Sequence, residues 1–111
     1  MFRHVNIDKT IAGEELERIL KEAAVEIGLR ATSVDRQSVR YRLGSMHKEE
    51  VYEGTEIRLR GRFFPVIDIS GIKRGRGQNC FFVKTGMSAT PYGFGSEKLV
   101  ERYLKAVSSL V

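Results

Sequence analysis

Apolar residues in the first quarter of the chain follow the spacing of an amphipathic helix. Between Ile11 and Ile27 they recur every three or four residues, which places them on one helical face. Glutamates crowd the early turns, where the helix dipole favours negative charge, and Gly28 follows as a residue that readily closes a helix. The pattern predicts a helix over residues 11–27, preceded by a short strand within residues 2–7.

Beyond Leu29 the period of the apolar residues changes from helical to two. Residues 39–43 and residues 57–63 each alternate apolar side chains with arginines, as half-buried strands do. The apolar runs at 63–69 and 80–83 extend this strand-rich region, and glycine-containing segments separate them. We therefore expect four or five consecutive strands with short connections, which favours an antiparallel sheet.

The last part of the chain returns to helical spacing. Apolar residues from Leu99 to Leu110 form one stripe, and Ser96 is suited to cap a helix over residues 97–110. The order strand, helix, four or five strands, helix predicts an α+β fold. Because neither helix can leave its apolar stripe in water, we expect a curved antiparallel sheet packed on two amphipathic helices.

This element order resembles the TBP-like and helix-grip architectures, in which a curved antiparallel sheet wraps a long C-terminal helix. The resemblance covers the order of the elements, and no family motif accompanies it. It therefore implies the fold and transfers no residue or activity to this chain, since a fold does not fix a function.

Length and composition indicate one globular domain covering residues 1–111. The chain is 41% hydrophobic and 30% charged, which is ordinary for a folded protein. No apolar run approaches the roughly 18 residues that a membrane-spanning helix needs, and no secretory signal is visible. The single cysteine, Cys80, cannot form a disulfide within the chain. We therefore predict a cytoplasmic protein without a membrane partner.

Positive charge is concentrated in the middle of the chain. The formal net charge is +5, and residues 29–86 carry 12 Lys/Arg against 6 Asp/Glu. Arginine donates paired hydrogen bonds that suit phosphate groups. If the two alternating strands are neighbours, their arginines line one exposed sheet face, and we predict a polyanion-binding surface formed by Arg40, Arg42, Arg58, Arg60 and Arg62. The alternative is a solvated face neutralised by Glu49, Glu50, Glu53, Glu56 and Asp68.

The segment from Gly71 to Asn79 adds a second basic candidate. It places Lys73, Arg74 and Arg76 among glycines and resembles arginine-glycine segments that contact nucleic-acid backbones. It lacks the Gly-Lys-Ser/Thr ending of a Walker loop. The alternative interpretation is a flexible hairpin tip with solubilising charge.

Adjacent phenylalanines in the predicted strands, Phe63–Phe64 and Phe81–Phe82, must point to opposite sides. We favour burial of all four rings against a helix or in a homo-oligomer interface. A ring left exposed beside arginines would instead offer a stacking surface for unpaired bases.

Catalytic and cofactor motifs are not recognisable. His4 and His47 are isolated, so we expect no metal site, and Cys80 within its apolar run is expected to be buried. We expect no cofactor. The leading hypothesis is a non-catalytic binding module whose basic surface binds nucleic acid or another polyanion. Two alternatives stay open: a small-ligand-binding protein or enzyme with a cavity between sheet and C-terminal helix, and a structural or assembly protein.

Overall fold

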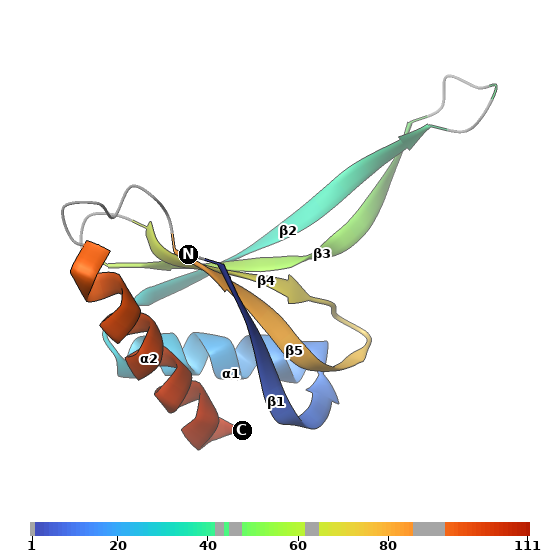
Figure 1. Ribbon diagram of the computed structural model, residues 1–111. Coiled ribbons are helices and arrows are strands. Elements are labelled where there is room, and N and C mark those ends of the chain that lie inside the picture. Colours follow the sequence, from blue (N-terminus) through green and yellow to red (C-terminus); the bar gives the residue numbers. More distant parts are fainter. Residues whose placement is uncertain (1, 42–43, 45–47, 62–64, 86–92) are drawn as a thin grey trace.

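The computed structural model describes residues 2–41, 44, 48–61, 65–85 and 93–111 (Figure 1). Its strands form one antiparallel sheet in the order β1-β5-β4-β3-β2, and two helices pack on it, which confirms the expected α+β class. The elements are β1 (Phe2–Ala12), α1 (Gly13–Glu26), β2 (Arg30–Tyr41), β3 (Lys48–Arg60), β4 (Pro65–Ile72), β5 (Gly77–Lys84) and α2 (Gly93–Leu110).

Both helices begin at positions that differ from those the sequence predicted. Helix α1 begins at Gly13 rather than Ile11, because Ile11 and Ala12 pair with Gln78 and Gly77 and so extend β1. Helix α2 begins at Gly93, so the glycines that indicated a loop lie in its first turn. A glycine there costs about 1 kcal/mol relative to alanine, which the packing of a long amphipathic helix can offset.

The core lies between one face of the sheet and the two helices. Ile57, Ile69 and Val83 are cross-strand partners from β3, β4 and β5, and all are fully buried. Tyr103 of α2 is also fully buried, and its hydroxyl donates a 2.7 Å hydrogen bond to the carbonyl oxygen of Leu20. Burial raises the pKa of Tyr103, so the phenol stays neutral and can act as this donor.

Both helices lie on the same side of the sheet (Figure 1). Successive strand residues point to opposite sides, so the neighbours of the buried residues project away from the helices. No helix or strand in the described part of the chain covers that side. We call it the open face.

The β2–β3 hairpin extends beyond the rest of the sheet (Figure 1). Strand β3 begins at Lys48, but its pairing with β4 begins only at Thr55. The preceding residues of β3 therefore pair with β2 alone and form a two-stranded arm. The radius of gyration is 15.6 Å, whereas a compact chain of this length would have about 13 Å, because the arm protrudes.

Candidate functional site

One row of cross-strand partners crosses the open face from edge to edge. Neighbouring strands lie about 4.8 Å apart, so the side chains of such a row are close neighbours. Each residue of the row is next in sequence to a residue whose side chain faces the helices. The row consists of Phe2, Lys84, Asp68, Arg58 and Thr32.

Four cations project from the open face without an ion pair to any carboxylate in the described ranges. Arg58 and Lys84 belong to the central row, and Arg60 and Arg30 lie directly opposite each other on β3 and β2. All four are exposed. Like charges on directly opposed strand residues repel, so this arrangement favours a bound anion. We refer to Arg30, Arg58, Arg60 and Lys84 as the open-face cations.

Acidic groups neutralise only part of this face. Arg36 binds Glu56 through a 2.9 Å contact between Nη1 and Oε1, so these two charges cancel. Asp68 lies between Arg58 and Lys84 in the central row, yet neither cation comes within 4.0 Å of its carboxylate. Its Oδ1 atom is buried and has no hydrogen-bond partner among the described residues. Within the described residues, the open-face cations therefore outnumber Asp68, the carboxylate that lies among them in the central row.

Three aromatic side chains adjoin these cations. Phe2 stacks on Phe82 with ring centroids 5.3 Å apart and planes 19° apart, and His4 lies against the same ring at 5.0 Å. We call Phe2, His4 and Phe82 the aromatic cluster. Phe81 is fully buried while Phe82 is half-buried on the open face, so the two rings of this pair face opposite sides. Phe63 and Phe64 lie outside the described residues.

The predicted strand arginines do not gather at one place. Arg58 and Arg60 lie together on the open face, whereas Arg40 lies in the arm opposite Glu49. Arg40 is eight positions along β2 from Thr32, the partner of Arg58, or roughly 26 Å. Arg42 and Arg62 lie outside the described residues. Arg30, which sequence reasoning missed, completes the open-face set because of its register opposite Arg60.

The second predicted basic segment forms the turn between β4 and β5, and hydrogen bonds hold its backbone in place. Gly13 N donates to Arg76 O at 2.8 Å, and Lys73 N donates to the Gln78 side chain at 2.8 Å. Gly75 N donates to the Glu14 carboxylate. The bonds that involve Gly13 and Glu14 fix the turn against the start of α1.

Arg74 of this turn is engaged by acidic side chains. Its Nε and Nη2 atoms each donate a 2.9 Å hydrogen bond to Glu17, and Nη1 lies 3.2 Å from the Asp35 carboxylate. Ser33 donates a further 2.8 Å bond to Glu17. These donors, Arg74 first, lower the pKa of the buried Glu17 carboxyl to about 2.

Sequence reasoning missed Glu17, although the helical spacing contains a signal for the burial of this residue. It lies four residues after Gly13 and three before Leu20, both buried, so the helical spacing places it beside the apolar stripe. A charged residue at such a position is buried only with a partner. The sequence could have indicated that a cation from elsewhere reaches Glu17.

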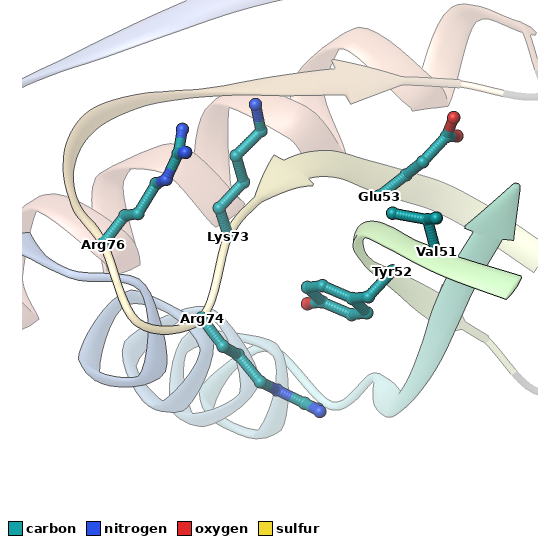
Figure 2. A pocket seen from close by; sticks show the side chains of 6 residues that line it. All are labelled: Val51, Tyr52, Glu53, Lys73, Arg74 and Arg76. Atoms are coloured by element: carbon teal, nitrogen blue, oxygen red, sulfur yellow. The ribbon is translucent and has the colours of Figure 1, made fainter. Parts of the chain in front are cut away.

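Lys73 and Arg76 point away from Arg74 and border a notch between the turn and the arm (Figure 2). The notch has a volume of about 590 Å³ and is also lined by Val51, Tyr52, Glu53 and Arg74. Both cations are exposed, and neither forms an ion pair within the part of the chain that is described. A smaller depression of about 260 Å³ beside Phe82 shares Glu53 with the notch.

Among the described residues, no group of three His, Cys, Asp or Glu side chains could hold a metal ion. Cys80 is half-buried rather than buried, because alternate residues of β5 face the open side. No helix in the described ranges is long and apolar enough to cross a membrane. No protein-family model, curated protein or solved structure matches this chain. The functional inference therefore depends on the geometry of the open face and the notch.

Proposed function

We propose that this protein is a non-catalytic module that binds nucleic acid or another polyanion across the open face of its sheet. The observation that carries the proposal is the group of open-face cations, Arg30, Arg58, Arg60 and Lys84. They are exposed, have no carboxylate partner in the described ranges and lie on the side that the helices leave uncovered.

The spacing of these cations suits a phosphate chain. Arg58 and Arg60 are two residues apart on one strand, roughly 7 Å, and Arg30 lies about 5 Å from Arg60 across the strand pair. Each guanidinium can donate two parallel hydrogen bonds to one phosphate. A bound anion would also relieve the repulsion between the opposed arginines.

Lys73 and Arg76 extend the proposed surface into the notch beside the arm. Arg74 does not belong to it in our proposal, because its guanidinium is already bound by the carboxylates of Glu17 and Asp35. Arg40, Arg42 and Arg62 stay predictions.

A ligand cavity between the sheet and α2 is a less suitable explanation. In the described part of the chain, the side chains between these layers pack against one another in the core cluster. Tyr103 and Val100 are both 0% exposed there, and Tyr103 is anchored to Leu20 by its hydrogen bond. These contacts support a surface site.

The test is a titration of labelled single-stranded and duplex oligonucleotides, followed by fluorescence anisotropy over a series of salt concentrations. Binding should weaken linearly in a log–log plot with a slope that counts the phosphate contacts. The double variant Arg58→Gln/Arg60→Gln should lower the absolute slope by about 1.5–2.

The matched control removes the same charge from the helix side. Arg102 and Lys105 are exposed on α2, so Arg102→Gln/Lys105→Gln should leave the slope almost unchanged. Equal decreases of the absolute salt slope in both double variants would show that binding depends only on the net charge of the protein. No binding by the unmodified protein even at low salt would refute the proposed function.

A further inference from the structure

The aromatic cluster exposes ring surface that no described helix or strand covers. Phe2 is 65% exposed, far more than a phenylalanine that contributes to a core. Its ring is nearly parallel to that of Phe82, so the two rings form an aromatic stack at the edge of the open face. His4 is the cross-strand partner of Phe82 on β1, and its ring lies against the Phe82 ring.

Gly71 holds the Phe82 ring in this place. A Cβ atom at Gly71 would lie 2.9 Å from Cδ2 of Phe82, so the ring rests against backbone that only glycine leaves uncovered. Gly71 also has a φ of 86°, a conformation that glycine adopts without a steric cost. The Phe82 ring is therefore positioned before any ligand arrives.

From these observations we infer that the aromatic cluster is a stacking site for unpaired bases, and that the polyanion is a single-stranded nucleic acid. The inference rests on the proposed function, because it names the ligand class of the same open face. Bases inside a duplex are stacked on one another and cannot present their faces to a sheet. Bases of a single strand can stack on aromatic side chains irrespective of sequence.

The nearest cations lie where the phosphates of such a strand would be. Lys84 is the cross-strand partner of Phe2 and is two residues from Phe82, roughly 7 Å along β5. Arg58 lies two strands further across the same row, roughly 10 Å from Lys84. A nucleotide whose base covers the cluster thus has its backbone within reach of Lys84, and the chain continues toward Arg58.

The experiment compares two ligands of equal charge at fixed salt. One is labelled oligothymidine of about 12 nucleotides, and the other is an abasic phosphodiester of the same length. We expect the protein to bind the oligothymidine about 10- to 100-fold more tightly, since one stacked base strengthens binding by roughly 5- to 160-fold. The variant Phe2→Leu/Phe82→Leu should lower this ratio to nearly one without changing the salt dependence.

Two further variants separate stacking from folding. Phe2→Tyr/Phe82→Tyr retains the rings and should preserve the ratio, and Val25→Ala removes an exposed apolar side chain from α1 and should also preserve it. Circular dichroism and thermal melting identify any variant that does not fold. If the leucine variant fails to fold, transferred nuclear Overhauser effects between thymine and the Phe rings of the unmodified protein decide the question.

The possible results distinguish this inference from the proposed function. Equal affinity for the oligothymidine and the abasic chain would overturn the stacking site while polyanion binding still stands. No affinity for either ligand at low salt would refute both. A homodimer that the leucine variant converts to monomers, with no change in the ratio of affinities, would assign the cluster to self-association and overturn the inference.

Discussion

The two faces of the sheet are built from the same strands but have opposite character. On the helix-covered face, Ile57, Ile69 and Val83 form one row and are fully buried. The sequence neighbours Arg58, Asp68 and Lys84 form the adjacent row on the open face. The strand pairing is common to both rows, so the difference arises from side-chain alternation and from the placement of both helices on one side. We therefore expect stability and the proposed polyanion binding to be separable in this molecule.

The strongest test of this separation compares two neighbours on β3. Ile57→Ala should lower the free energy of unfolding by about 2–5 kcal/mol, because it leaves a cavity in the packed core. Arg58→Ala should change it by no more than about 0.5 kcal/mol, because its side chain is exposed. Urea denaturation measures both values. Similar losses in the two variants would contradict the assignment of stability to one face.

Glu17, a charged residue on the helix side of the sheet, should contribute to stability rather than to polyanion affinity. Glu17→Gln should destabilise the fold by about 1–3 kcal/mol at neutral pH, because Arg74 and Ser33 lose their charged acceptor. The polyanion affinity of the folded protein should change little.

The pH dependence of stability follows from the same carboxyl group. Its pKa is about 2 in the folded protein and near 4.5 when unperturbed, so the unfolded state binds a proton first as the pH falls. The stabilisation by Glu17 is therefore complete above about pH 4.5 and is lost as the pH falls toward 2. Thermal melting from pH 6 to pH 2 should show a steeper decline for the unmodified protein than for Glu17→Gln. Parallel curves would show that this ion pair does not couple to folding.

Alanine substitutions at two glycines with left-handed backbone separate the effect of backbone strain from the effect of displacing the Phe82 ring. Gly71 and Gly75 have φ values of 86° and 80°, so an alanine at either should cost about 1 kcal/mol or slightly more. Only at Gly71 would the new Cβ meet Phe82, whereas nothing lies within 4 Å of it at Gly75. We expect Gly71→Ala alone to weaken oligothymidine binding in the anisotropy assay. Equal binding by both variants would mean that the position of Phe82 does not matter.

The smallest expected effect concerns the ion pair on the open face. Glu56→Gln should alter stability by less than about 0.5 kcal/mol, because Arg36 is largely exposed. It should nevertheless release Arg36 for phosphate binding and raise the absolute salt slope by up to about 0.9. An unchanged slope in the titration would place Arg36 outside the path of the ligand.

Local patterns in the sequence were sufficient for the fold class but not for the site. Alternation on β3 correctly placed Arg58 and Arg60 on one side, opposite Leu59. The presence of Arg30 beside Arg60 depends on the register of the β2–β3 pairing, which a single sequence does not specify.

The remaining features depend on contacts between distant parts of the chain. Adjacent Phe81 and Phe82 indicated that one ring faces away from the other, but the stacking of Phe2 on Phe82 requires β1 to pair with β5. Likewise, the bond from Arg74 to Glu17 joins residues 57 positions apart. Periodicity within a segment carries no information about such partners.

The pairing of β1 with β5 has a consequence for the order of folding. Its partners lie 65 to 82 positions apart in sequence, whereas those of the β2–β3 hairpin are 7 to 30 positions apart. Closing the longer loop costs more chain entropy, so we expect the hairpin to form early and β1 to dock late, an order that pulsed hydrogen exchange can resolve. Since Phe2 and His4 reach Phe82 only through β1, a nascent chain would acquire the proposed stacking site at the final step of folding, and partly folded molecules would lack it.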